Sequence, residues 1–452
     1  METLTRILTL VRDAAWGLPT MMLLLGTGLF FTIRLRGMQF IRFPRAVKMI
    51  FEKEDGAGEV SPFGSLCTSL AATIGTGSIV GVATALRIGG PGALFWMWIS
   101  ALLGMATKYA ESLLAVKYRC LDEKGHHSGG PMYYIQNGMG RRWIPLAKMF
   151  ALFGLMTALL GCGTFPQVNS ITESMRDLTG VQPWITGLVV TALSGAVILG
   201  GLKSISKVAE FVVPIMAVLY IGGAVTVLFI NLHSIPSVFS GIFSAAFRPT
   251  SVAGGVSGTV AVSVMTSMRT GIARGIYTNE AGLGSSPIVS ASAKTNSCVR
   301  QGLISMTGVF FTTIVVCTMT GFVILSSGLL NTSELSGGVL AGQAFSIGLP
   351  GGAGEYIVAV GIAFFSFTTI IGWCFYGERC VVYLTGGTKA ILPYKVLYLV
   401  MLGVAPFLSL EPIWTLADIT NALMAFPNLI ALLALQRDVV SETALFWKSG
   451  KK

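Results

Sequence analysis

The sequence predicts an all-α membrane protein with about eleven transmembrane helices. Of its 452 residues, 53% are hydrophobic and only 11% are charged, whereas a soluble domain carries about 25% charged residues. Apolar stretches of about 20 residues, enough to cross about 30 Å of hydrocarbon, recur along the whole chain. The 55 glycines suit close helix packing and helix interruptions in lipid. So little charge cannot cover a water-facing surface of this size.

The hydropathy pattern divides the chain into an added first span and two sets of five. The predicted spans are 17–35, 63–86, 91–119, 147–172, 184–201, 207–231, 250–293 (interrupted), 299–327, 352–379, 391–410 and 412–436. We expect the added span with its basic tail at 1–60, the two sets at 61–231 and 250–436, and a cytoplasmic tail at 437–452. Because five is odd, the second set crosses in the opposite direction, as in inverted-repeat transporters. The polar, glycine-containing segment 52–59 predicts a flexible linker.

The basic residues indicate orientation rather than nucleic-acid binding. The net charge is +11, but with the N-terminus outside only a few basic residues face outward: Arg6, Arg12, Arg87, Arg176 and Arg248. The remaining lysines and arginines fall on or near the other side, which is the bias of cytoplasmic loops. The first 16 residues lack a cleavable signal pattern. We expect a multi-pass protein of the cell inner membrane with a cytoplasmic C-terminus and no nucleic-acid partner.

The chain shows no pattern of an enzyme or a metal centre. None of the seven Cys falls in an outer loop, no CxxC or Cys/His spacing occurs, and the three His lie in loops. No HExxH, paired Asp or Ser/His/Asp set is found, so we expect no catalysis and no cofactor. A channel would need a continuous polar pore, whereas the polar groups here cluster at two glycine-rich segments.

Those two segments predict broken helices. The first is Ala71–Ser78, and the second is placed at Thr270–Gly275, with Gly254–Gly258 as an alternative. Paired interruptions at corresponding places indicate a binding site near the bilayer midplane. Unwound turns free carbonyls for a cation and amides for a carboxylate. The alternative interpretation is that these glycines only allow close helix packing.

Four blocks in order along the chain resemble the alanine/glycine:cation symporter family. They are GGPGALFWMWISALLG at 89–104, ATIGTG at 72–77, GIYTNEAGLG at 275–284 and IIGWCFYGE at 370–378. The resemblance implies a carrier of small neutral amino acids, chiefly alanine and glycine, driven by Na⁺, with proton coupling or uncoupled facilitation as alternatives. It also implies the leucine-transporter-like fold, with one extra helix before a ten-helix core. We expect a monomer in the lipid bilayer.

The family pattern also implies residues for the substrate and the cation. Those for the substrate are Thr73, Gly77, Gln167, the main chain of Thr270, Gly271, Ile272 and Ala273, and Trp373 as a size limiter. Those for Na⁺ are the carbonyls of Ala71, Ile74 and Phe365 and the hydroxyls of Thr368 and Thr369. Hydroxyls in apolar helices also bond back to their own carbonyls, which is the alternative. No carboxylate is placed to carry a proton at the midplane, so Na⁺ is the expected coupling ion.

Buried charges and departures from the family pattern complete the prediction. Lys108 and Glu111 share a helix face and could pair or reach the membrane surface, Glu280 is a candidate for gating, and Asp418 has no assigned role. Ser78, Thr270 and Thr312 stand where the family usually has Asn, an aromatic residue and Asp. A small Thr270 should enlarge the pocket, so that a medium-sized neutral amino acid could compete with alanine.

Overall fold

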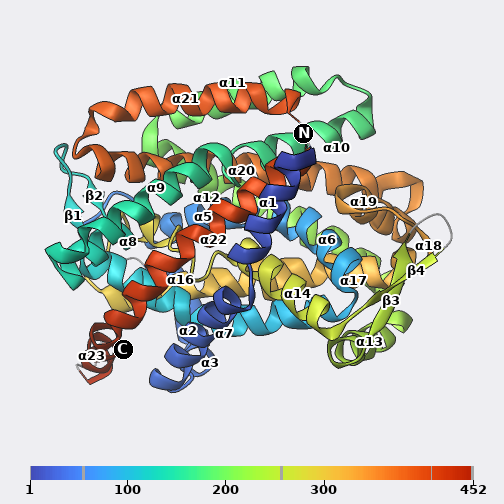
Figure 1. Ribbon diagram of the computed structural model, residues 1–452, viewed down its shortest axis with the longest axis horizontal. Coiled ribbons are helices and arrows are strands. Elements are labelled where there is room, and N and C mark those ends of the chain that lie inside the picture. The colour runs from blue at the N-terminus through green and yellow to red at the C-terminus, as the bar shows by residue number, and fades with distance from the viewer. Residues whose placement is uncertain (1, 53–55, 255–257, 409, 449–452) are drawn as a thin grey trace.

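The computed structural model describes residues 2–52, 56–254, 258–408 and 410–448, and most of them are helical (Figure 1). Two short antiparallel hairpins, β1–β2 (Cys120–Leu121, His127–Ser128) and β3–β4 (Thr250–Gly254, Gly258–Val262), account for the strands of this part. Within these residues, 8 helices are long and apolar enough to cross a membrane. The all-α class is confirmed, while the number eleven stays a prediction.

The N-terminal region contains four helices where one span was expected. Its elements are α1 (Glu2–Ala15), α2 (Leu18–Arg34), α3 (Met38–Ile41) and α4 (Phe43–Phe51). The predicted span at 17–35 corresponds to α2, but the mixed residues before it form α1, which packs against the late helix α22 (Leu410–Ala434). The indole Nε1 of Trp16 donates to the Asp418 carbonyl at 2.8 Å. The N-terminal helix is therefore attached to a helix from the last part of the second set.

The first set of helices has two interruptions. Its elements are α5 (Pro62–Thr73), η1 (Thr76–Ser78), α6 (Val80–Gly89), α7 (Gly92–Lys117), α8 (Pro131–Tyr134), η2 (Ile135–Met139), η3 (Arg141–Trp143), α9 (Ile144–Leu160), α10 (Phe165–Thr179), α11 (Pro183–Ile198) and α12 (Gly201–Ile230). The predicted single span at 147–172 is in fact α9 and α10. Gly161 and Gly163 separate them, and Pro166 starts the new helix because proline is tolerated in a first turn.

The second set begins later than predicted. Its elements are η4 (Leu232–Ser234), α13 (Ile235–Phe247), α14 (Val264–Asn279), α15 (Pro287–Ser290), α16 (Cys298–Val309), η5 (Phe310–Cys317), α17 (Thr318–Ser326), α18 (Leu329–Thr332), α19 (Gly337–Gly348), η6 (Pro350–Gly352), α20 (Ala353–Thr385), η7 (Thr388–Ala390), α21 (Ile391–Val404), η8 (Ala405–Phe407), α22 and α23 (Gln436–Lys448). The predicted span at 250–293 starts only at Val264, because the hairpin β3–β4 occupies 250–262. The alternative break at 254–258 falls in this hairpin, and 255–257 lie outside the described residues. The division into inverted repeats stays a prediction.

The predicted break at Thr270–Gly275 is wrong, because α14 runs through it without interruption. The glycines there allow close packing against α7, which was the alternative interpretation. A Cβ atom at Gly271 would lie 2.3 Å from the Ala93 carbonyl oxygen, and one at Gly275 would lie 2.2 Å from Ser100 Oγ. The chain unwinds only after Asn279, where Glu280, Gly282 and Gly284 have positive φ.

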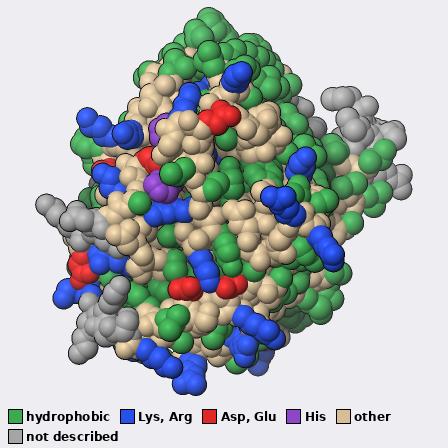
Figure 2. Space-filling view, turned by 90° about the vertical axis from the view of Figure 1, so that its left-hand side faces the viewer, with side chains coloured by type: hydrophobic (Ala, Val, Ile, Leu, Met, Phe, Trp, Pro, Cys, Tyr) green, Lys and Arg blue, Asp and Glu red, His purple; other side chains and the backbone are tan. Residues whose placement is uncertain are grey.

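One end of the molecule is rich in basic side chains, and we name it the basic end. It carries β1–β2 and α23, at the left of Figure 1, and Figure 2 shows Lys, Arg and His side chains gathered on it. Behind this surface lies a buried chain of alternating charges. Glu378 binds Lys395 at 3.1 Å and Arg379 at 2.6 Å, and Arg379 binds Asp122 at 3.0 Å. Burial acts to raise the pKa of Asp122, but hydrogen bonds from the His126 backbone and Arg379 hold that pKa below its usual range.

Replacing Gly271 by Val tests the packing role of α14. The new side chain would overlap the α7 backbone at Ala93, and such overpacking costs about 1–3 kcal/mol. We therefore expect Gly271→Val to lower the melting temperature of the purified protein. Gly222→Val on α12 is the matched control, since a Cβ there meets nothing within 4 Å. Equal melting temperatures of the two variants would contradict this role.

Candidate functional site

The first helix break lies between α5 and α6, where it was predicted. The Ser61 hydroxyl caps α5 by accepting the Gly64 amide at 2.9 Å, and α5 ends at Thr73. Gly75 is extended, and the single turn η1 then leads into α6. A Cβ at Gly75 would lie 2.5 Å from Thr369 Oγ1 and 3.2 Å from Gln167 Oε1. Only glycine lets the side chains of α20 and α10 approach the broken backbone this closely.

Gln167 connects the first break to the α9–α10 interruption. Its side-chain oxygen accepts the Thr76 amide at 3.2 Å, and its Nε2 donates to the Cys162 carbonyl at 3.0 Å. The side chain is buried at 1% exposure. A neutral amide can satisfy broken-helix backbone without bringing a charge into the membrane. The structure therefore places this predicted residue directly at the break.

The oxygens predicted to bind the cation lie between α5 and α20. The Thr369 hydroxyl is 3.1 Å from the Ala71 carbonyl oxygen and 2.9 Å from that of Phe365, which also accepts Thr368 at 3.0 Å. Ile74 follows at the end of α5, and its amide donates to Leu70. Carbonyl and hydroxyl oxygens are the hard ligands that Na⁺ needs. Both hydroxyls donate to these carbonyls, as the alternative interpretation expected, so cation binding requires their hydrogens to turn away.

The other substrate candidates of the first break and of α20 face the same region. A Cβ at Gly77 would lie 3.0 Å from the Tyr277 ring and from Thr278, near the end of α14. The Trp373 indole donates to Glu280 Oε1 at 3.0 Å. The hydroxyl of Thr73 bonds to the Ser69 carbonyl in its own helix. Gly77 therefore brings the first break against the last turn of α14, while Trp373 connects α20 to Glu280 at the second break.

The four consecutive candidates on α14 do not reach this region. Thr270, Gly271, Ile272 and Ala273 precede the end of α14 by about two turns, or about 10 Å. Thr270 instead lies beside Gly89 at the end of α6, where a Cβ would be 3.1 Å from it. Thr270 therefore lies apart from the second break, and its effect on the size of the substrate pocket stays a prediction. Gly282 and Gly284, in the block 275–284, carried the correct signal for the break.

The second break is held by two charged side chains of α7 that were expected to pair with each other or reach the surface. Lys108 donates to the Asn279 carbonyl at 2.9 Å, where a cation complements the C-terminal end of α14. Glu111 Oε1 accepts the Gly282 and Gly284 amides, both at 3.1 Å. Lys108 and Glu111 are fully buried. Both thus replace the water that unwound backbone would otherwise require.

Two further contacts complete the second break. Asn428 of α22 donates to Glu111 Oε1 at 2.6 Å and to the Gly282 carbonyl at 2.9 Å. Glu280 Oε2 accepts the Ser285 hydroxyl at 2.5 Å, while its other oxygen accepts Trp373. The buried group therefore holds two carboxylates, Glu111 and Glu280, but one ammonium, Lys108. The contact between these charged side chains and the break could not be predicted from the sequence, because Glu111 and Gly282 are about 170 residues apart in the chain.

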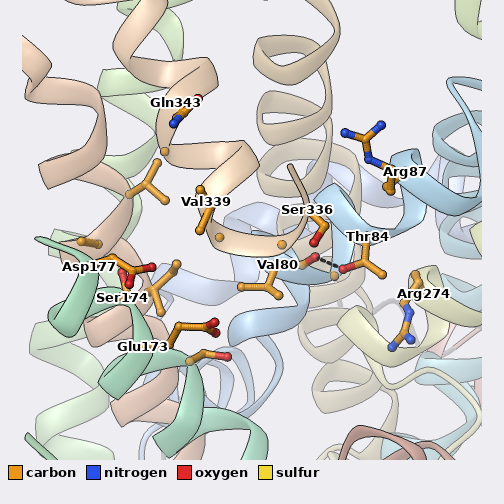
Figure 3. A pocket seen from close by; sticks show the side chains of 18 of the residues that line it. Val80, Thr84, Arg87, Glu173, Ser174, Asp177, Arg274, Ser336, Val339 and Gln343 are labelled. Carbon is orange, nitrogen blue, oxygen red and sulfur yellow. Dashed lines mark hydrogen bonds between the residues drawn. The ribbon is translucent and has the colours of Figure 1, made fainter. Parts of the chain in front are cut away.

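A cavity of about 720 Å³ leads from the surface to the first break. It is bounded by α6, α10, α14, α19, α20 and α22, and Val80 and Gly81 line it directly after the break. Figure 3 shows Glu173 and Asp177 of α10 on one wall, opposite Arg87 and Arg274. This cavity was not predicted from the sequence.

Asp418, which had no predicted role, forms an ion pair with Arg274 beside this cavity. Two pairs of atoms in these side chains are each 3.3 Å apart. The pair connects α14 to α22, and the Arg274 guanidinium also lies 5.6 Å from the centre of the Tyr277 ring. One negative and one positive charge cancel here, in contrast to the second break.

The sequence matches the profile of the sodium:alanine symporter family across residues 1–452. It is 44% identical to the sodium/alanine symporter AgcS of Methanococcus maripaludis, over 96% of this chain and 96% of AgcS.

Two solved structures share the fold. The crystal structure of MhsT in complex with L-phenylalanine matches 85% of this chain and 99% of MhsT, with a TM-score of 0.51 and 11% identity. The crystal structure of the Eremococcus coleocola manganese transporter matches 84% of this chain and 82% of the manganese transporter chain, with a TM-score of 0.56 and 13% identity. At such low identity these likenesses show the fold alone, and they confirm the leucine-transporter-like class.

Replacing Glu111 tests whether it supports the second break. Glu111→Leu removes the acceptor of two backbone amides and of Asn428, and each buried donor left without a partner costs about 1–3 kcal/mol. We expect a strongly lowered melting temperature, with Glu111→Gln between it and the unchanged protein. Glu355→Leu, at an exposed position, is the control. A Glu111→Leu variant that melts like this control would exclude the supporting role.

Proposed function

Because the chain belongs to the sodium:alanine symporter family, we propose that it imports a small neutral amino acid of the alanine and glycine class together with Na⁺. The observation that carries this proposal is the meeting of two broken helices around Gln167, Gly77 and Trp373. Transport follows by alternating access, in which the site opens first to one side of the membrane and then to the other.

The chemistry of the first break suits a zwitterion. A carboxylate needs N–H donors and an ammonium needs oxygen acceptors, and main-chain groups supply both without a full buried charge. We assign Thr73, Gly77, Gln167 and Trp373 to the substrate, with Gly77 contributing main-chain groups. Tyr277, which faces Gly77, takes the place of Thr270–Ala273 as the wall contributed by α14.

The coupling ion is assigned to the oxygens between α5 and α20. These are the carbonyls of Ala71, Ile74 and Phe365 and the hydroxyls of Thr368 and Thr369. Because α5 carries both this site and the first break, an ion bound here would fix the broken helix in the shape that receives the substrate. Na⁺ is the only accessory ion in this proposal, and no organic cofactor takes part.

A second candidate is coupling to protons, and one specific observation favours it. We expected no carboxylate placed to carry a proton at the midplane, but Glu111 and Glu280 are both buried at the second break. With Lys108 charged, the group has a net charge of −1, which is costly within a membrane. A proton on Glu280 would neutralise it, and Glu280 contacts Trp373 of the proposed substrate site.

The charge distribution supports the route and the orientation. The basic end in Figure 2 faces the cytoplasm in this proposal, as the excess of Lys and Arg indicates. The cavity then opens outward, and a zwitterion entering it meets acidic residues on α10 and basic ones opposite. The protein acts as a monomer in the cell inner membrane, with its N-terminus outside and its C-terminus inside.

Replacing Gln167 tests the substrate site. A buried hydrogen bond to a charged group contributes about 1.5–3 kcal/mol, so we expect Gln167→Ala to raise the half-saturation concentration for alanine by about 10- to 150-fold. Uptake of labelled alanine into proteoliposomes measures this effect. Gln343→Ala removes an amide from the outer cavity wall and serves as the control. An unchanged half-saturation in well-folded Gln167→Ala would remove Gln167 from the site.

Separate ion gradients test the coupling. We expect labelled alanine to accumulate when an inward Na⁺ gradient is imposed and not when only a pH gradient is present. Thr369→Ala removes a proposed ligand and should raise the Na⁺ half-saturation at least tenfold, while exposed Thr226→Ala should not. Accumulation driven by pH alone and lost in Glu280→Gln would establish the second candidate instead.

A further inference from the structure

At the basic end, two segments distant in sequence lie against each other, and we name them together the strap. Residues 56–60 precede α5, and residues 291–296 follow α15. The Glu59 and Val60 amides donate to the Ser292 carbonyl at 2.9 and 3.3 Å, and the Lys294 amide donates to the Val60 carbonyl at 2.8 Å. The segment 52–59 was predicted to be a flexible linker, but its residues 57–59 lie in paired backbone.

Arg119 binds both segments of the strap at once. Its Nη1 donates to the carbonyls of Ala291 and Ala293, both at 2.9 Å. Its Nη2 donates to the carbonyls of Ala57 at 2.9 Å and Thr295 at 2.8 Å. The planar guanidinium presents its donors in a fixed fork, which a lysine cannot reproduce. Arg119 lies two residues beyond the end of α7. Its hydrogen bonds therefore attach both segments of the strap to the end of this helix.

The glycines of the strap allow its two backbone segments to approach each other closely. A Cβ at Gly56 would lie 2.6 Å from the carbonyl carbon of Thr295, and one at Gly58 would lie 2.4 Å from that of Ala293. Gly58 also has a φ of +152°, which side chains disfavour. A Cβ at Gly129, beside β2, would lie 2.4 Å from the Ala291 side chain. The contact is therefore built for a close fit of backbone against backbone.

The strap joins the inner halves of the two broken helices. α5 runs from the strap to the first break, and α15 runs from the second break to the strap. Between them, Ser69 of α5 and Ser286 at the start of α15 have hydroxyl oxygens 2.7 Å apart. The cavity lies beyond the other end of α7, beside Arg87, and α7 is about 39 Å long. The cavity and the strap therefore lie at opposite ends of α7.

We propose that Arg119 holds the cytoplasmic gate of the transporter shut by binding the four strap carbonyls. This inference rests on the proposed function for its direction of transport. Substrate that leaves toward the cytoplasm must pass between α5 and α15, so these helices must part. When α5 and α15 part, Ala57 separates from the segment 291–295. Arg119 then loses its hydrogen bonds either to Ala57 or to the segment 291–295. Arg119 touches neither substrate nor cation, and it acts by positioning the inner half-helices.

Thiol labelling at Ser69 tests the gate. In the full-length Ser69→Cys protein, we expect slow labelling by a membrane-impermeant maleimide applied to the cytoplasmic face, because Ser69 is buried against Ser286. Adding Arg119→Ala should increase the labelling rate at this position at least tenfold, with Arg119→Lys in between. Mass spectrometry resolves this position from the native cysteines. Arg142→Ala, which changes an exposed arginine in η3 just before α9, is the matched control.

Two further measurements keep the proposal decidable. Should Arg119→Ala fail to fold, Gly58→Ala separates the strap directly and should increase labelling in the same way. A labelling rate unchanged from that of Ser69→Cys alone, in a folded Arg119→Ala or Gly58→Ala variant, would overturn the gate. A rate that rises only with reagent on the opposite face would overturn its cytoplasmic position. Labelling needs neither substrate nor ion gradient, so a failure of the transport proposal is detected separately, by absent alanine uptake.

Discussion

The structure depends on one constraint: a helix broken inside a membrane leaves backbone groups that no water can satisfy. The chain meets this constraint with different chemistry at its two breaks. At the first, the neutral amide of Gln167 binds the Thr76 amide. At the second, the charged side chains of Lys108 and Glu111, which belong to the neighbouring helix α7, bind a carbonyl and an amide of the unwound backbone. The first break keeps its surroundings uncharged and suits a zwitterion, whereas the second is rigidly supported.

Helix α7 provides most of this support. Its first half packs against the glycine face of α14, its middle holds the second break through Lys108 and Glu111, and Arg119 beyond its end binds the strap. A single continuous helix thus contacts the outer half, the break and the inner half of the second broken helix. Motion between these parts must then occur relative to α7, and the contacts of Arg119 are the ones that lie furthest from the packed centre.

Hydropathy and the four sequence blocks were sufficient for the fold class, the first break and the residues around it, because these signals are local. Gly75 and Gly77 mark the break within a few residues of where the structure has it. The second break was misplaced because glycine serves two purposes. Gly271 and Gly275 permit close packing, while Gly282 and Gly284 permit positive φ, and composition alone does not separate these cases.

The charged partners of the second break could not be found from sequence, since they come from a helix far away along the chain. Lys108 and Glu111 are three residues apart, which suggested a pair, but their actual partners are backbone groups at Asn279, Gly282 and Gly284. For the same reason the glycines at 56 and 58 suggested flexibility, although they permit contact with residues 293–295.

The contact of Trp16 with Asp418 has a practical consequence for handling the protein. Helix α1 packs on α22, and Arg12 lines the cavity beside the Arg274–Asp418 pair. A fluorescent protein or affinity tag joined ahead of α1 would be tethered close to the cavity, where it can obstruct entry or strain the bond to α22. Helix α23 ends at the basic end, away from that opening (Figure 1). Fusions for localisation, purification or single-molecule work therefore belong at the C-terminus.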